Sequence, residues 1–297
     1  MSNHLEEFLV WLTEEGKDSK TIVAYRIAIT QFITWYEGSG GTDITLVKPI
    51  DVKEYVSYMK HVLNRFQATV NKSVAALKTF YNYLSDIGAV IDNPMTRIKL
   101  QKIRHTEGTK NNARWLTRQE QERFISYVNL EKNDTKRLRN LAIIDLMLYC
   151  GLRVNEVSDL KLDDIKVGTN IRLVVRAGKQ GKYSVVTLLN KHGRNLKQWL
   201  RQRRNHKYST SPYLFVSERA EWFSPRGIQL MLEKYAKLAN MEGVTPHRFR
   251  HSFCKNLAQA GVGIEIIRRL ARHESIQTSA IYIDPSYNEQ MEALARI

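Results

Sequence analysis

The most informative segment of the sequence is residues 245–251, Thr-Pro-His-Arg-Phe-Arg-His. Threonine is a favoured helix N-cap and proline a favoured first helical residue, so a helix is predicted to begin at Pro246. On that helix His247, Arg250 and His251 share one face near the N-terminus, where the helix dipole favours an anion. The segment indicates a phosphate-binding site, although a solvated basic face, or contact to a phosphate backbone without catalysis, would give the same pattern.

Further basic residues precede this segment. Arg153 follows a glycine that predicts a helix end, and its planar guanidinium can bind two phosphate oxygens. Glu156 can hold that guanidinium if the segment turns helically, although Arg and Glu at this spacing are also a common surface pair. Lys179 lies in Gly-Lys-Gln-Gly-Lys, where a mobile ammonium could protonate a leaving oxygen. Lys182 in the same turn competes for that role.

A histidine and a tyrosine complete the set. His273 is followed nine positions later by Tyr282. A phenol ionises near pH 10 and is a weak nucleophile at neutral pH unless nearby cations stabilise its charge. Most of the 14 tyrosines serve packing, and Tyr282 differs from them only by its place after these cations. Cations suited to phosphate, followed by a hydroxyl nucleophile, suggest phosphoryl transfer through a covalent tyrosine adduct.

Composition favours a polyanionic partner. The chain has 297 residues, a net charge of +16 and a pI of 9.8, and neutralising phosphates releases condensed counterions. The sequence contains no run of about 18 apolar residues, so no membrane span is predicted. Cys150 and Cys254 have no paired spacing, so neither a disulfide framework nor a zinc site is expected. These features lead us to expect a cytoplasmic protein associated with the nucleoid.

The chain divides at a basic stretch. Apolar residues at helical spacing predict four helices in roughly the first 90 residues, the third of them capped by Asp51 and Glu54. Ile-Asp-Asn-Pro at 91–94 stops this pattern because proline disfavours helix in the residue before it. Residues 97–114 are polar and basic, as in a linker that could follow a phosphate backbone or simply be solvated.

The second half mixes helices with a small sheet. Thr117 and Glu120 predict a capping box, and a helix is expected over 137–150. Residues 171–176 and 183–188 are rich in β-branched side chains and flank a glycine-containing turn, which predicts a hairpin. Helical patterning returns near Ser224. The predicted fold class is therefore mainly α with a small β-sheet in the C-terminal domain.

The ordered motifs resemble a known family. Arg with Glu three later, Lys in a β-turn, His-x-x-Arg-His, then His and Tyr nine apart are similar to the signature of the tyrosine recombinases, the integrase family that includes the Xer proteins and Cre. The resemblance covers nearly the whole chain and is to compact Xer-like and Cre-like members. It implies a two-domain C-shaped clamp, with a helical, SAM-like core-DNA-binding domain at 1–93, a basic linker at 94–115 and a catalytic domain with a C-terminal tail helix at 116–297.

The resemblance also implies roles for individual residues. Tyr282 would be the nucleophile, Arg153 and Arg250 clamps on the scissile phosphate, Lys179 the general acid, His247 a proton-transfer group and His273 a hydrogen-bond partner of the phosphate. Glu156 would be supporting and His251 structural. Candidate DNA contacts are Lys99, Lys102, Arg104 and Lys182. Neither a metal nor a cofactor is expected.

The implied activity is site-specific recombination. The partner would be a double-stranded recombination site, bound by a homotetramer on two duplexes with or without a second recombinase or accessory protein. The reaction would pass through a 3′-phosphotyrosyl link and a Holliday junction, in integration, excision or resolution of a mobile element or replicon dimers. The amphipathic end of the chain would dock on a neighbouring subunit or on its own domain. A type IB topoisomerase, a non-catalytic DNA-binding regulator on the same fold, and a structural basic protein are the alternatives.

The chain departs from the family pattern at two places. Leu270-Ala271-Arg272-His273 stands where Leu-Gly-His is usual, and the missing glycine makes the local turn uncertain. Phe249 stands where leucine is usual, which is a mild change.

Overall fold

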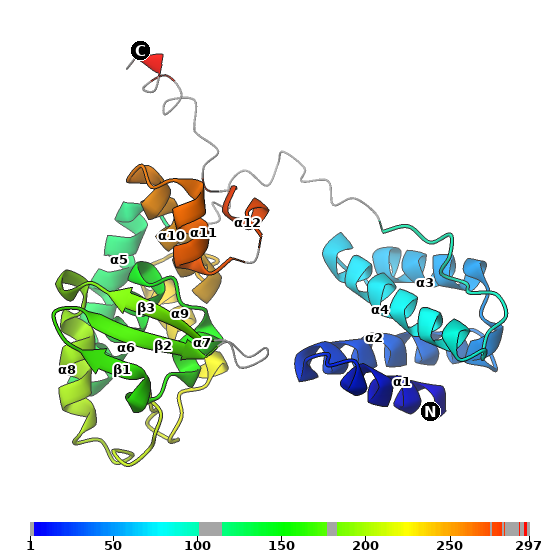
Figure 1. Ribbon diagram of the computed structural model, residues 1–297, viewed down its shortest axis with the longest axis horizontal. Helices are drawn as coiled ribbons and strands as arrows, with labels where there is room; N and C mark the ends of the chain where they lie inside the picture. Colours follow the sequence, from blue (N-terminus) through cyan, green and yellow to red (C-terminus); the bar gives the residue numbers. More distant parts are fainter. Residues whose placement is uncertain are drawn as a thin grey trace. The chain divides into compact units, whose positions relative to one another are not determined.

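The computed structural model describes residues 3–100, 115–176, 183–273, 275–280, 282, 291, 294 and 295. The chain separates into two compact units, Met1–Thr109 and Lys110–Ile297, each with its own hydrophobic core. Helices dominate both units, and a small antiparallel sheet lies in the second (Figure 1). The predicted fold class is confirmed. Within the described ranges, no helix is both long and apolar enough to cross a bilayer.

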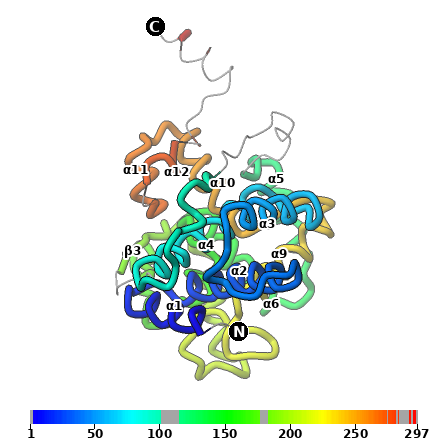
Figure 2. Tube along the Cα trace, turned by 90° about the vertical axis from the view of Figure 1, so that its right-hand side faces the viewer, coloured from blue at the N-terminus to red at the C-terminus, as the bar shows by residue number. Residues whose placement is uncertain are grey.

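The first unit is a small helical bundle. Its helices are α1 (Asn3–Glu14), α2 (Ser19–Gly38), α3 (Pro49–His61) and α4 (Gln67–Asp86), with a 3-10 turn, η1 (Ile44–Leu46), between α2 and α3. Helix α2 packs against both α1 and α4, as Figures 1 and 2 show from two directions. The four helices predicted from apolar spacing are confirmed.

Aromatic rings fill the centre of this bundle. Phe8, Phe32 and Phe80 are fully buried, and the rings of Phe8 and Phe80 meet edge to face at 5.1 Å between centroids. Such edge-to-face contacts add to the stabilisation from burial. The buried Tyr81 hydroxyl donates to the Ile44 carbonyl at 3.0 Å, which joins α4 to η1.

The predicted cap of α3 is wrong in position. The helix begins at Pro49, and the Lys48 amide donates to the Asp51 carboxylate at 2.8 Å. Asp51 is therefore the third residue of the helix and not its N-cap, and Glu54 takes no part in the cap. The reason is Pro49, whose fixed φ and missing N–H suit the first helical position.

The second unit contains the remaining elements. In chain order they are α5 (Arg118–Asn129), α6 (Asp134–Tyr149), α7 (Val154–Asp159), η3 (Leu162–Asp164), β1 (Ile165–Val167), β2 (Ile171–Arg176), β3 (Tyr183–Leu188), η4 (Asn190–His192), α8 (Arg194–Arg203), α9 (Pro225–Leu238), α10 (Pro246–Gln259), α11 (Ile264–Ala271) and α12 (Gln277–Ala280). The predicted capping box of α5 is confirmed, because Thr117 and Glu120 exchange hydrogen bonds between side chain and backbone.

The sheet has the order β1-β2-β3 and is antiparallel throughout. The predicted strands are confirmed in register, with Val174 opposite Val185, and β1 is an additional short edge strand. Along β2 the side chains alternate, so that Ile171, Leu173 and Val175 are buried. They belong to the same core as residues of α6 and α8, which places the sheet against these helices.

The C-terminal end of α6 turns sharply into α7. Gly151 follows the last turn with φ of 60°, and the Leu152 amide donates to the Leu146 carbonyl at 3.3 Å. A Cβ at Gly151 would overlap the ring of Phe253 on α10. Glycine thus allows both the left-handed turn and the close approach of α10. Helix α11 packs against α10, and α12 against α11 (Figure 2).

The Gly151→Ala substitution should destabilise the second unit more than Gly261→Ala. Both glycines have positive φ, but nothing lies within 4 Å of a Cβ built at Gly261. Gly261→Ala should therefore cost about 1 kcal/mol of strain, and Gly151→Ala a further 1–3 kcal/mol or so from the overlap with Phe253. Urea unfolding of both variants measures the difference, and equal losses would contradict this account of the α6–α10 contact.

Candidate active site

The start of α10 carries the central motif. The helix begins at the predicted proline, and the Thr245 hydroxyl accepts from the Arg248 amide at 3.3 Å, which confirms the predicted cap. His247 is exposed, His251 is half-buried and Arg250 is buried. The rings of the two histidines lie 6.4 Å apart between centroids, as expected for residues one turn apart on one face.

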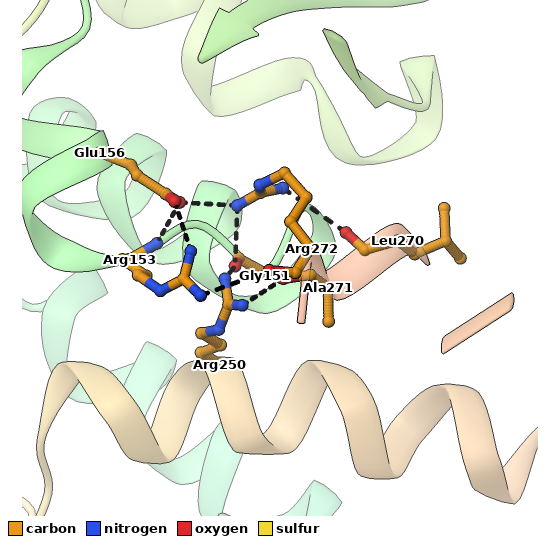
Figure 3. A network of polar contacts seen from close by, with 7 residues as sticks. All are labelled: Gly151, Arg153, Glu156, Arg250, Leu270, Ala271 and Arg272. Carbon is orange, nitrogen blue, oxygen red and sulfur yellow. Dashed lines mark hydrogen bonds and ion pairs between the residues drawn. The ribbon is translucent and has the colours of Figure 1, made fainter. Parts of the chain in front are cut away.

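Arg250 joins three segments. Its side chain is only 5% exposed, and its two terminal nitrogens donate to the carbonyls of Gly151 and Ala271 (Figure 3). The pKa of Arg250 is lowered to about 10, first by burial and then by Arg153, while Glu156 opposes the shift. The guanidinium remains charged at neutral pH, so the site holds a fixed buried cation.

Arg153 and Glu156 are paired as predicted. Arg153 is the N-cap of α7, and its Nη1 lies 2.8 Å from Glu156 Oε1 while its backbone amide donates to Oε2 at 2.7 Å. The Arg153 side chain is 43% exposed, so it remains open to a ligand. Burial raises the pKa of Glu156, but Arg272 and then Arg153 outweigh it, and the carboxylate stays ionised at neutral pH.

Tyr282 packs among polar groups of α10 and the segment beyond α11. The ring is 1% exposed, and its hydroxyl contacts His251 Nδ1. The His273 ring stacks on it with centroids 6.2 Å apart, and His273 Nδ1 lies 2.8 Å from Ser279 Oγ. Lys255 Nζ donates to the Tyr282 carbonyl at 3.4 Å. His251, expected to be structural, is thus the histidine that contacts the phenol.

The arginines and the histidines lie within one electrostatic environment. The pKa of His273 is lowered to about 4, first by burial and then by the charges of Arg250 and Arg153. His247 is exposed but partly withdrawn from solvent, and this partial desolvation, followed by Arg250 and Arg153, lowers its pKa. Cations disfavour a further positive charge nearby. At neutral pH both imidazoles are therefore neutral and able to accept a proton.

A further arginine lies in this cluster. Arg272 Nη2 donates to Glu156 Oε2 at 2.6 Å, with 13% and 14% of the two side chains exposed. Its backbone is left-handed, with φ of 55° and ψ of 47°, a conformation that glycine adopts readily, so the turn forms here without glycine. Arg272 was not predicted as a site residue, because the family motif has glycine at this position. The only sign of its role in the sequence is the replacement of that glycine by arginine.

Five further cations were predicted to serve catalysis or DNA binding. Lys99 is exposed beyond the last helix of the first unit, and the other candidate cations, Lys102, Arg104, Lys179 and Lys182, are outside the described residues. In the part of the chain that the structure describes, no group of three or more His, Cys, Asp or Glu residues is placed to hold a metal ion. At the C-terminus Met291 and Leu294 are described, and both are exposed.

The basic run at 201–207 is not uniformly solvated. Arg203 is 3% exposed, and its guanidinium donates to the carbonyls of Ser209, Ser211, Tyr213 and Leu214. This arginine closes the loop after α8. Arg201, Arg204 and Lys207 are exposed.

Acid should destabilise the second unit through His273. Its pKa is about 4 in the folded chain and 6.5 ordinarily, so unfolding takes up a proton in this window and stability falls as pH drops through it. His273→Gln should lose less stability between about pH 7 and pH 5 than the parent protein, as measured by urea unfolding. His61→Gln, at an exposed position on α3, is the control. Equal acid sensitivity of the His273 variant and the parent would contradict the assignment.

Comparison with known proteins identifies the family of the chain. Residues 114–289 match the phage integrase family, and residues 3–88 match the phage integrase N-terminal SAM-like domain. The chain is 29% identical over 284 residues to the TnP I resolvase of Bacillus thuringiensis. The matched region covers 95% of each chain. It is 29% identical over 298 residues to the tyrosine recombinase XerA of Pyrococcus horikoshii, covering 99% of this chain and 93% of the relative.

Solved structures show the same fold. The structure of the XerH site-specific recombinase bound to palindromic difH substrate, a post-cleavage complex, superposes with a TM-score of 0.75 at 20% identity. The match covers 92% of this chain and 79% of that one. With the family match extending over more than half of its length, the chain belongs to the phage integrase family.

Proposed function

We propose that this chain is a site-specific DNA recombinase, an enzyme that cuts and rejoins DNA strands through a 3′-phosphotyrosyl intermediate. The observation that carries the proposal is the packing of Tyr282 against His251 and His273. In the same unit Arg250 donates to the Gly151 carbonyl, two residues before Arg153, and Arg153 donates to the Arg272 carbonyl. Membership of the phage integrase family and the named recombinases among its relatives support it.

In the cutting step the Tyr282 oxygen attacks the scissile phosphorus. A P–O bond to tyrosine forms, the P–O bond to the 5′ oxygen breaks, and the leaving 5′ oxygen takes a proton from Lys179. The phenol proton passes to an imidazole, either that of His251, which contacts the phenol, or that of His247 one turn earlier on α10. The phosphoester is conserved in the tyrosyl link, so rejoining by a 5′-hydroxyl of the partner duplex needs no ATP.

Arginines stabilise the charge that develops on the phosphate. Arg153 is partly exposed and presents a planar fork to two oxygens. Arg250 supplies a buried cation behind it, and His273 offers a ring nitrogen for a hydrogen bond to a phosphate oxygen. Loss of one preorganised donor of this kind typically slows a reaction about a hundred- to a thousand-fold.

The partner is a double-stranded recombination site. A net charge of +16 favours phosphate contacts, which position a protein on DNA without reading its sequence. Each of the two units contacts the duplex, and the basic segment at 94–115 joins them. Four copies act on two duplexes through a Holliday junction, and the exposed apolar residues Met291 and Leu294 contact a neighbouring copy in a ring. This chemistry takes place where the chromosome is, in the nucleoid.

Similarity to the TnP I resolvase favours a role in a mobile element. A type IB relaxing enzyme would share the tyrosine chemistry without exchanging partners, and the named relatives are recombinases or resolvases instead. Strand exchange between two labelled duplexes separates these two activities.

Tyr282→Phe should abolish the covalent adduct and leave DNA binding intact, because only the nucleophilic oxygen is removed. A nicked duplex of the cognate inverted-repeat site traps the adduct, which denaturing gels then measure. The matched control is Tyr235→Phe, which removes another buried hydroxyl of the same unit, hydrogen-bonded to Glu131 at 2.6 Å, and should retain the adduct. Adduct formation by the Tyr282 variant would refute the nucleophile assignment.

Replacing Lys99, Lys102, Arg104 and Lys182 together by glutamine should weaken DNA binding at every sequence. The slope of log affinity against log salt is negative, and each lost phosphate contact reduces its magnitude by about 0.9, so four reduce it by up to roughly 3.6. Titrations at several salt concentrations measure the slope. Lys234→Gln is the control, since that lysine is already paired with Glu131 at 2.7 Å. A slope equal to that of the parent protein would exclude these residues from the interface.

A further inference from the structure

Arg272 adopts a backbone conformation that arginine rarely takes. It follows the last turn of α11 with φ of 55° and ψ of 47°, in the left-handed region that glycine occupies readily. A non-glycine residue keeps such a conformation when the surrounding contacts determine it. The contacts of its side chain are therefore informative.

Those contacts lead to the carboxylate of Glu156. Arg272 Nη2 lies 2.6 Å from Glu156 Oε2 and 3.4 Å from the Gly151 carbonyl. Both charged side chains are largely shielded from water, with 13% and 14% exposed. Shielded charge pairs interact more strongly than pairs at the surface.

Glu156 is shared between two arginines (Figure 3). Its Oε1 accepts from Arg153 Nη1 at 2.8 Å, while Oε2 accepts from Arg272 and from the Arg153 backbone amide. Arg272 also contacts Arg153 directly, because its carbonyl accepts from Arg153 Nη2 at 3.4 Å. Both terminal nitrogens of Arg153 therefore depend on Arg272 for their positions. Nη2 bonds its carbonyl directly, and Nη1 bonds Glu156, which Arg272 holds.

We infer that Arg272 is a positioning residue: through Glu156 and through its own carbonyl it fixes the guanidinium of Arg153 in the orientation that receives the scissile phosphate. The inference rests on the proposed function, in which Arg153 binds that phosphate. Arg272 itself acts through Glu156 and does not contact the phosphate. Arginine at this position adds a support for Arg153 that glycine in the usual motif cannot supply.

The test is a double-mutant cycle on single-turnover cleavage of the nicked site at saturating DNA. Arg272→Gly keeps the left-handed turn and removes only the side chain, and Glu156→Gln keeps a residue that can cap α7. Arg272→Gly should slow cleavage by about tenfold, typical of residues coupled in one network, and should slow it no further when combined with Glu156→Gln. Arg272→Lys should restore part of the rate.

The control is Arg269→Ala, in the last turn of α11 before Arg272, where the side chain is 76% exposed and pairs with Glu265. Its cleavage rate should equal that of the parent protein. If Arg269→Ala slowed cleavage as much as Arg272→Gly, lost charge alone would explain the Arg272 effect.

If Arg272→Gly slows cleavage equally with and without Glu156→Gln, Arg272 contacts the phosphate itself and the inference is wrong. It is also wrong if Arg272→Gly cleaves at the parental rate. Absence of adduct in the parent protein would instead overturn the proposed function.

Discussion

One buried guanidinium organises the candidate site. Arg250 on α10 donates to the carbonyl of Gly151, just beyond α6, and to that of Ala271, the last residue of α11. A buried charge is costly unless its N–H groups are matched. Carbonyl oxygens match them without adding negative charge, so the site keeps its cation. The same two bonds hold the segments carrying Arg153 and Arg272 against α10.

The net positive charge of the site stabilises a transition state more than a bound ground-state phosphodiester. Arg153, Arg250 and Arg272 are accompanied by the carboxylate of Glu156, which leaves the network in Figure 3 positively charged. A phosphodiester carries one negative charge and gains more as the tyrosine oxygen bonds to phosphorus. Excess positive charge therefore stabilises the transition state more than the ground state, which is the condition for acceleration. The same cations help to keep His273 neutral.

Local signals predicted the fold well, and tertiary contacts explain what they missed. Capping residues and apolar spacing located α5, α6 and α10 because these signals act within a turn or two of chain. His247 and His251 lie on one face of α10, so spacing alone could not tell which would meet the phenol. That depends on the path of the chain to Tyr282. The role of Arg272 depends on Glu156, which lies 116 positions away in sequence.

In the proposed mechanism, DNA binding has to relieve the burial of Tyr282. Its ring is 1% exposed and packs on His273, so an attack on phosphorus from outside requires the ring to leave this packing. Exposing a buried aromatic side chain costs about 2 kcal/mol. Phosphate contacts remote from the scissile bond can offset that cost, and binding energy used in this way raises the rate of the chemical step. In the proposed mechanism cleavage is thereby coupled to binding of the full site, because isolated phosphate lacks the remote contacts.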